Sequence, residues 1–197
     1  MYTCRVTDQN FAVFDTAMGA CALAWSERGI VGVQLPGKDV AATRSQMLRR
    51  FRGACELAPP PSILRVIGDI AAMLHGERRD FADVALDQSV VSEFNRRVYA
   101  VVRAIPWGAT MSYGEVAERL GNVALAREVG RAMGANPTPI IVPCHRVLAA
   151  RGKVGGFSAP GGVATKLRLL KLEGTHPCGG PTLFDHLPRM TAPLRRV

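Results

Sequence analysis

The sequence predicts a two-domain α/β protein, with a small N-terminal α/β domain over residues 1–88 and a C-terminal domain of helix-turn-helix or winged-helix-like type over residues 89–174. Short β-rich runs separated by glycine-containing turns fill residues 11–35, and helical patterns dominate from residue 93 to 135. A length of 197 residues with 48% hydrophobic composition is enough for one larger core or two small ones. Residues 175–197 contain four prolines and predict a flexible tail.

The N-terminal elements predict an antiparallel hairpin or meander followed by two helices. Apolar runs at residues 11–14, 21–25 and 30–35 are separated by turns at Met18-Gly19 and at residues 26–29. Residues 40–52 and 62–75 place apolar side chains at helical spacing, with three prolines between them at residues 59–61. The polar segment 77–92 predicts a strand and a linker. No residue in this half indicates chemistry.

Three helices are predicted in the C-terminal half. The first covers residues 93–105 and ends at Pro106-Trp107-Gly108. Ser112, followed three residues later by Glu115, predicts a capping box for the second helix, which ends before Gly121. A third helix over residues 124–135 follows after a very short connection, a pattern typical of a helix-turn-helix.

The third predicted helix has three different faces. An apolar face repeats every four residues, a second face has almost no side chains, and a third is basic: these are Leu125, Val129 and Met133; Ala126, Gly130 and Gly134; and Arg127 and Arg131. Glycine inside a helix costs about 1 kcal/mol relative to alanine, so the small face needs a reason. Close approach of another protein helix and close approach of DNA both remain open.

Positive charge is concentrated in the C-terminal half. Of the net charge of +9, residues 94–173 contribute +8, with 12 Lys/Arg against 4 Asp/Glu. A localised positive field attracts polyanions such as nucleic acid, although an ordinary basic surface has the same composition.

Several classes of protein are disfavoured by the composition. No apolar stretch has membrane-spanning length, and the N-terminus lacks the pattern of a secretion signal. The five cysteines are odd in number and form no CxxC pair, which argues against a disulfide framework and against a metal site. We therefore expect a cytoplasmic protein that binds no metal and no membrane.

Cys144 and His145 place a nucleophile beside a titratable base, after an apolar run at residues 139–142 that predicts a buried strand. A free thiol has a pKa of about 8.5, so His145 is a candidate base and Glu173 a candidate to orient its ring. Adjacent side chains on a strand point to opposite faces. Either the chain turns at this pair or a water bridges it. The alternative is an inert buried cysteine beside a chance histidine.

Residues 94–174 resemble the active-site domain of the O6-alkylguanine-DNA alkyltransferases, also called methylated-DNA–protein-cysteine methyltransferases. The matching motifs stand in the family's order: Ile105-Pro106-x-Gly108-x-Thr110-x-Ser112-Tyr113-Gly114, Ala126-Arg127-x-Val129-Gly130, Asn136-Pro137, Pro143-Cys144-His145-Arg146-Val147, Gly152-x-Val154-Gly155-Gly156-Phe157, Lys166-x-x-Leu169-Leu170 and Glu173-Gly174. The N-terminal half matches more loosely, mainly through Met18-Gly19. The resemblance implies a ribonuclease-H-like N-terminal domain and repair of O6-alkylguanine, with weaker action on O4-alkylthymine.

The resemblance also implies a role for each matching residue. Cys144 would accept the alkyl group, and His145, polarised by Glu173, would act as general base through a water. Tyr113 would donate a proton to the departing guanine, and Asn136 would brace the turn before the active-site segment. Arg127 would fill the gap left by a flipped nucleotide. The remaining implied contacts are Ala126, Gly130, Arg131 and Ser112 on DNA, and Val147, Phe157, Ser158 and Met133 around the lesion.

Further expectations concern turnover, metal and rival functions. A thioether has no carbonyl for water to attack, so one protein molecule would be consumed per lesion. We expect the protein to act without a cofactor, as a monomer on double-stranded DNA.

Some relatives hold zinc in the N-terminal domain, but Ser26 and Val31 stand at two ligand positions here. The loop 158–162 looks longer than in many relatives and leaves the tolerated alkyl size open. The rivals are a lesion-binding protein without transfer activity and a Cys-His hydrolase.

Overall fold

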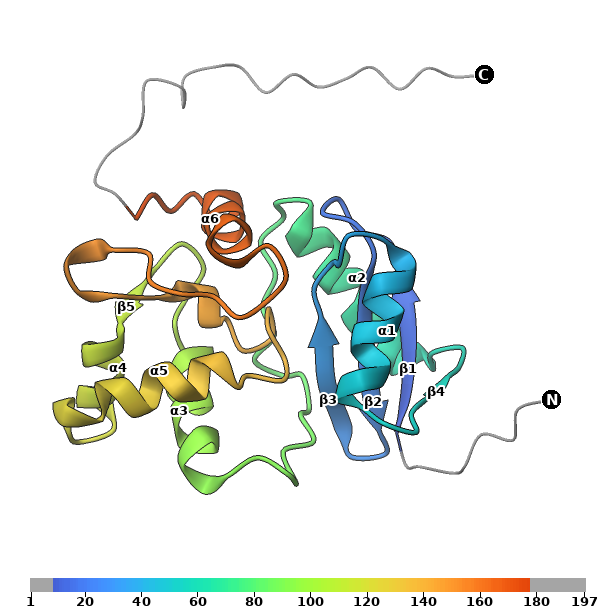
Figure 1. Cartoon of the computed structure of the whole chain (residues 1–197), viewed down its shortest axis with the longest axis horizontal. Helices are drawn as coiled ribbons and strands as arrows, with labels where there is room; N and C mark the ends of the chain where they lie inside the picture. The colour runs from blue at the N-terminus through green and yellow to red at the C-terminus, as the bar shows by residue number, and fades with distance from the viewer. Residues whose placement is uncertain (1–8, 178–197) are drawn as a thin grey trace, which may run out of the picture.

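The computed structural model describes residues 9–177, whose N-terminal part is built on a four-stranded sheet of order β3-β2-β1-β4 (Figure 1). The strands are β1 (Asn10–Phe14), β2 (Cys21–Ser26), β3 (Gly29–Gln34) and β4 (Cys55–Glu56). The first three pair antiparallel, which confirms the predicted meander. The two-residue β4, which the sequence did not predict, pairs parallel with β1.

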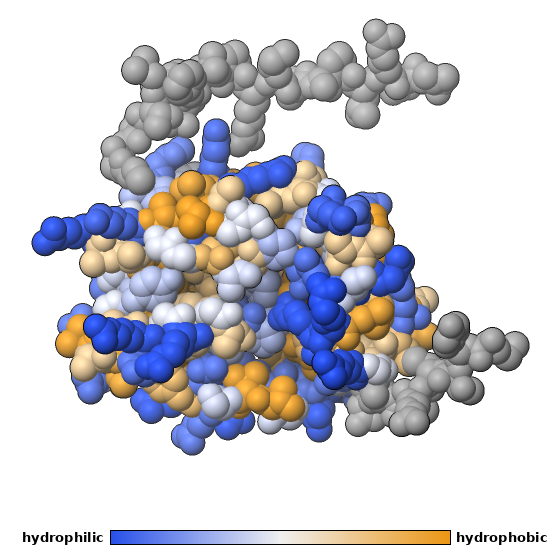
Figure 2. Space-filling view, viewed as in Figure 1, coloured by the Kyte–Doolittle hydropathy of each residue, from blue (hydrophilic) through white to orange (hydrophobic). Residues whose placement is uncertain are grey.

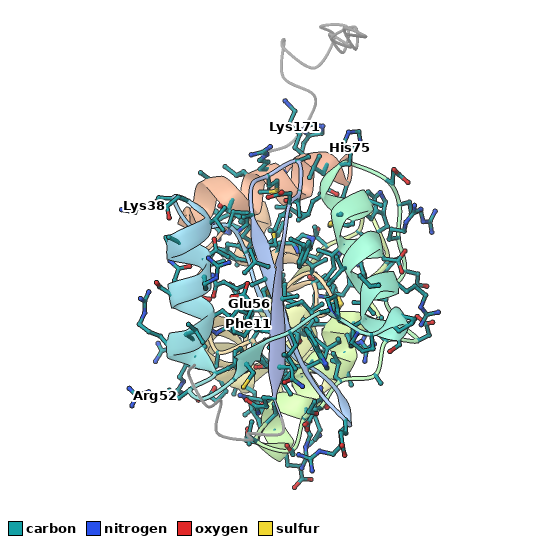
Figure 3. All side chains as sticks on the ribbon, turned by 90° about the vertical axis from the view of Figure 1, so that its right-hand side faces the viewer. Phe11, Lys38, Arg52, Glu56, His75 and Lys171 are labelled. Atoms are coloured by element: carbon teal, nitrogen blue, oxygen red, sulfur yellow. The ribbon has the colours of Figure 1, made fainter. Side chains whose placement is uncertain are left out.

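Two helices cover the two faces of this sheet (Figure 3). One face packs on α1 (Val40–Arg50) through Met47, and the other packs on α2 (Pro61–Leu74). Strand β2 is buried along its whole length because it faces a helix on either side. Asp39 caps α1 by accepting a hydrogen bond from the Ala42 amide at 2.7 Å, and Pro61 begins α2, so both helices start where local signals place them.

The segment between α2 and the next helix is irregular, and the strand predicted within residues 77–92 is wrong. In this segment a single bridge joins Leu86 to Ile30. The Ile30 amide donates to the Ala85 carbonyl, and the Asp87 amide donates to the Ile30 carbonyl. The segment 77–92 is mostly polar, so it offers too little apolar surface for a longer strand to bury.

The C-terminal part is mainly helical. Its helices are α3 (Glu93–Arg103), α4 (Tyr113–Arg119), α5 (Ala126–Gly134) and α6 (Gly162–Leu172), and α5 is preceded by the short 3₁₀ turn η1 (Val123–Leu125). The predicted capping box is confirmed at the start of α4, where Ser112 and Glu115 satisfy each other's backbone amides. Helices α3, α4 and α5 share one apolar core, and β5 (Met111–Ser112) pairs parallel with β6 (Val147–Leu148) beside it.

Residues 139–142 form a tight turn, so the buried strand predicted there is wrong. The Val142 amide donates to the Thr138 carbonyl at 2.9 Å, and Ile140 has φ of +77°. This left-handed conformation is unfavourable for a β-branched residue. Ile140 is nevertheless 1% exposed, because it packs with Ile141 in the core that α2 forms with the sheet.

Among residues 9–177, no helix is long and apolar enough to cross a membrane, and no three metal-ligating side chains cluster. At the two positions considered for zinc, the Ser26 hydroxyl donates to Asp87 at 2.7 Å and Val31 is buried in the core. Cys21 and Cys144 are buried free thiols, whereas Cys55 is disulfide-bonded, contrary to the expectation that the odd cysteine count disfavours disulfides. The predicted flexible tail lies outside the described residues from position 178 onward.

Candidate active site

Cys144 lies at the start of η2 (Cys144–Arg146), a 3₁₀ turn that directly follows the turn at residues 139–142. The chain therefore turns at the Cys-His pair, which was one of the two predicted possibilities. Cys144 is 6% exposed and borders a cleft of about 590 Å³. The cleft lies between the two parts of the molecule: its walls come from β3, α1, the end of α5 and residues 157–160.

Glu173, the residue after α6, holds the active-site turn together from behind. Its carboxylate lies 2.9 Å from His145 Nε2 and accepts hydrogen bonds from Arg146 Nε and Nη2 at 2.8 to 3.1 Å. The side chains of His145 and Glu173 are fully buried. Burial alone would raise the pKa of Glu173, but the hydrogen bonds from His145 and Arg146 outweigh burial and lower this pKa to about 2. The carboxylate is therefore ionised at neutral pH.

His145 is set up to accept a proton on its other nitrogen. Burial lowers the pKa of His145 more strongly than Glu173 raises it, so the ring is neutral at pH 7. With Nε2 donating its proton to Glu173, the neutral ring carries a lone pair on Nδ1. Nδ1 is buried and has no hydrogen-bond partner among the described residues. Its position suits a base that acts through a small intermediary.

The thiol of Cys144 is protonated at rest, because burial raises its pKa. Several effects lower this pKa, and the two largest are a hydrogen bond with Asn136 and the positive charge of Lys166. The Asn136 side chain also spans the preceding turn, donating to the Val142 carbonyl at 2.9 Å and accepting from the Thr138 amide at 3.0 Å. At rest the thiol keeps its proton. The thiolate forms when a base removes that proton, beside groups that stabilise the negative charge on sulfur.

Lys166 is a site residue to which the sequence analysis gave no role. Its side chain is fully buried, Nζ donates to the Val147 carbonyl at 2.6 Å, and it lies 5.9 Å from the centre of the Tyr113 ring. Burial lowers the pKa of Lys166 to about 8, against the raising effect of Cys144. The signal in the sequence was a lysine on the same helical stripe as Leu169 and Leu170, both of which are buried.

Arg146 was also missed, although it belongs to the matched motif. Its guanidinium joins Glu173 to the Ile105 carbonyl, at 2.6 Å from Nη1. Tyr113 begins α4, is half-buried, and has a pKa raised by burial and by the nearby Cys144. Arg146 thus ties the segment that carries Cys144 to Glu173 and to the end of α3, and Tyr113 lies near the thiol.

The predicted lesion-contacting residues are distributed unevenly around the cleft. Met133, Phe157 and Ser158 line it. Val147 is buried, its amide donates to the Cys144 carbonyl, and its own carbonyl already accepts from Lys166. Any hydrogen bond between a base and the Val147 backbone must therefore use the second lone pair of the carbonyl oxygen.

The outer face of α5 is open at Gly130 and Gly134, which excludes the helix-packing explanation for these two residues within the described chain. A Cβ atom added at Gly130 or Gly134 would meet nothing within 4 Å. Arg127 is exposed beside this face, and Arg131 is exposed in an ion pair with Glu128 at 2.7 Å. Ala126 is half-buried at the first position of the helix. The space-filling view shows strongly hydrophilic surface around α5 and again near α1 (Figure 2).

Together, the α/β fold, the open basic helix and the buried cysteine define a DNA-binding protein with a nucleophilic site. The family model for the DNA binding domain of 6-O-methylguanine DNA methyltransferase matches residues 93–175. The methylated-DNA–protein-cysteine methyltransferase of Mycolicibacterium paratuberculosis is 36% identical over 178 residues, which are 89% of this chain and 98% of that protein. The chain belongs to the methylated-DNA–protein-cysteine methyltransferase family.

Solved structures agree with this assignment. The O6-methylguanine methyltransferase of Mycobacterium tuberculosis superposes with a TM-score of 0.67 and 32% identity, covering 84% of this chain and 92% of that one. A structure of the M. tuberculosis protein in complex with DNA has the same TM-score and identity, over 83% of this chain and 92% of that one. The protein is accordingly a DNA-repair methyltransferase whose partner is DNA and whose acceptor is a cysteine of its own chain.

Proposed function

We propose that this protein repairs O6-alkylguanine in double-stranded DNA by moving the alkyl group irreversibly to Cys144. The observation that carries the proposal is a buried thiol at the wall of a large cleft, backed by the His145–Glu173 pair and by the charge of Lys166. A Cys-His hydrolase would need two further features, a site for an oxyanion and a route for water to the covalent product. Alkyl transfer to Cys144 requires neither.

The reaction begins with proton transfer from the Cys144 thiol, through one water, to Nδ1 of His145. The thiolate then attacks the alkyl carbon on guanine O6, so that a carbon–sulfur bond forms as the carbon–oxygen bond breaks. The electron pair of the broken bond goes to the guanine, and Tyr113 supplies the proton that neutralises it. Glu173 stabilises the imidazolium, and Lys166 stabilises the thiolate.

The thioether product explains why a single turnover is expected. Water cannot displace a thiolate from an unactivated alkyl carbon, and Cys144 is not regenerated. Each protein molecule therefore removes one alkyl group. O4-alkylthymine presents the same oxygen–alkyl bond, and we infer a weaker reaction with it.

The lesion must leave the base stack to reach Cys144, because an alkyl carbon inside a duplex is inaccessible to a side chain. The open face of α5 allows this helix to approach a groove of DNA closely, with Ala126 and Gly130 at the contact. Arg127 projects from the same helix and fills the gap in the stack, while Ser112 and Arg131 contact the DNA beside it. Met133, Phe157 and Ser158 then surround the flipped base in the cleft.

We further propose that the chain has two domains. Residues 1–88 form a ribonuclease-H-like domain, and residues 89–174 form a winged-helix-like domain in which α4 and α5 are the helix-turn-helix. One cysteine acting on one lesion needs only a monomer. We also propose a cytoplasmic location.

The test is the intact mass of the protein after incubation with a duplex that contains one O6-methylguanine. We expect a gain of one methyl group, mapped to Cys144 by peptide analysis and absent in Cys144→Ala. Cys21→Ala is the matched control, since Cys21 is also a buried free thiol and burial raises its pKa to about 12. DNA binding without a mass gain would favour a lesion-binding protein. Cleavage of an ester or peptide probe would favour the hydrolase.

A further inference from the structure

The turn that precedes Cys144 is held by hydrogen bonds from the N-terminal half of the chain. The Pro137 carbonyl accepts from the Val33 amide at 2.9 Å and from Arg50 Nη2 at 3.0 Å. The same guanidinium uses Nη1 to donate to the Val33 carbonyl at 3.0 Å and to Gln34 Oε1 at 3.1 Å. Arg50, the last residue of α1, therefore links α1, β3 and the active-site turn.

Packing adds to these bonds. Ile140 and Ile141 lie in the same core as Leu23, Val33 and Leu35 of the N-terminal sheet region. Ile140 keeps a φ of +77° there, a conformation that persists only when the surrounding structure enforces it. Figure 1 shows β3 as the strand of the sheet nearest the C-terminal half. The N-terminal half thus enforces the shape of the turn.

The turn is coupled directly to the nucleophile. The Val142 carbonyl accepts from Asn136 Nδ2 at 2.9 Å and from the Cys144 amide at 2.7 Å. A shift of Pro137 moves Asn136 beside it, and with it the group that bonds the Cys144 thiol. A misplacement of about 1 Å at a reacting group can cost a hundredfold in rate.

We propose that the N-terminal half is a positioning element for alkyl transfer and that Arg50 is its positioning residue. The inference rests on the proposed function, because it concerns the geometry of the same cysteine. Arg50 also borders the cleft, but the role proposed for it is exerted through its bond to the Pro137 carbonyl and not through contact with DNA or the lesion. Its loss therefore lowers the rate of transfer within the bound complex and leaves DNA affinity nearly unchanged.

The experiment compares Arg50→Ala and Arg50→Lys with Arg44→Ala. Arg44 lies on the same helix and carries the same charge, but its guanidinium pairs with Glu56 inside the N-terminal half at 2.8 Å. Single-turnover reactions with an O6-methylguanine duplex give the limiting rate and the half-saturating DNA concentration separately. We expect Arg50→Ala to lower the limiting rate about tenfold or more, with half-saturation within about twofold of the wild type. Arg50→Lys should recover part of the rate. A lysine ammonium can donate to the carbonyl of either Val33 or Pro137, whereas the forked guanidinium donates to both.

A second readout is independent of repair. Hydrogen exchange should become about tenfold faster in peptides covering residues 138–144 of Arg50→Ala, and should be unchanged there in Arg44→Ala. Equal effects of both alanine variants on rate and exchange would show general loosening and overturn the proposal, as would wild-type values in Arg50→Ala. If the wild type itself transfers no methyl group, the proposed function fails, while the exchange comparison still decides whether Arg50 holds the turn.

Discussion

Glu173 is the residue whose loss should disturb the molecule most, and Glu173→Gln is the perturbation that tests this. The carboxylate is fully buried and bonds both His145 and Arg146. The amide keeps the shape of the side chain but removes its charge and turns an NH₂ group toward the guanidinium. Arg146, whose side chain is 8% exposed, would then lose its ion-pair partner and keep only neutral acceptors, the Ile105 carbonyl and the amide oxygen.

Two independent routes give similar magnitudes. Removing one partner of a buried ion pair costs about 3 to 5 kcal/mol, because the other charge stays buried and unpaired. The pKa of Glu173 is lowered from 4.5 to about 2, which corresponds to about 3 kcal/mol of folding stability. Because the folded-state pKa is the lower one, this stability is complete above pH 4.5 and is lost as the pH falls toward 2.

Urea unfolding of wild type and Glu173→Gln at several pH values measures the effect. The difference in unfolding free energy should be about 3 kcal/mol at pH 7, or roughly 10 °C in Tm, and should shrink below pH 4.5. Glu118→Gln is the control, since Glu118 is exposed on α4. Adding Arg146→Met to Glu173→Gln should restore part of the loss. A cost below about 1 kcal/mol at pH 7, or a difference that does not vary with pH, would refute the reasoning.

Three further predictions concern single residues. Lys166→Met should slow alkyl transfer about a hundredfold at saturating DNA, because the charge that favours the thiolate is lost; an unchanged single-turnover rate would exclude that role. Gly130→Ala should raise the unfolding free energy by about 1 kcal/mol, whereas Gly130→Leu should weaken DNA binding in an anisotropy titration; a destabilised alanine variant would contradict the open face of α5. Ser112→Ala should cost about 1 kcal/mol in urea unfolding through loss of the capping box, and Glu118→Gln should not.

Elements governed by neighbouring residues were predictable from the sequence. The strands of the meander, the proline at the start of α2 and the Ser112–Glu115 cap all depend on interactions within a few positions, and each lies within a few residues of its predicted place. The pairing of His145 with Glu173 was different. Glu173 was named as a candidate to orient His145, and the resemblance to a family supported that choice, but no periodicity connects two residues that lie 28 positions apart.

The features that escaped prediction depend on distant parts of the chain. An apolar run at residues 139–142 has the composition of a strand, but its turn is fixed by bonds from Val33 and Arg50 to Pro137. Strand β4 has two residues, too few for any alternation to show. Lys166 carried a readable signal, a charged residue on an apolar stripe, which indicates either an error in the helix assignment or a buried charge with a partner.

The open face of α5 has a consequence for how this protein can be improved or can evolve. Selection for thermal stability alone would fill Gly130 and Gly134 with alanine or larger residues, because nothing inside the described chain opposes a side chain there. Under the proposed mode of DNA binding, the constraint on these positions comes from outside the molecule. Variants chosen without DNA present should therefore drift toward proteins that tolerate heat better while leaving more lesions in place.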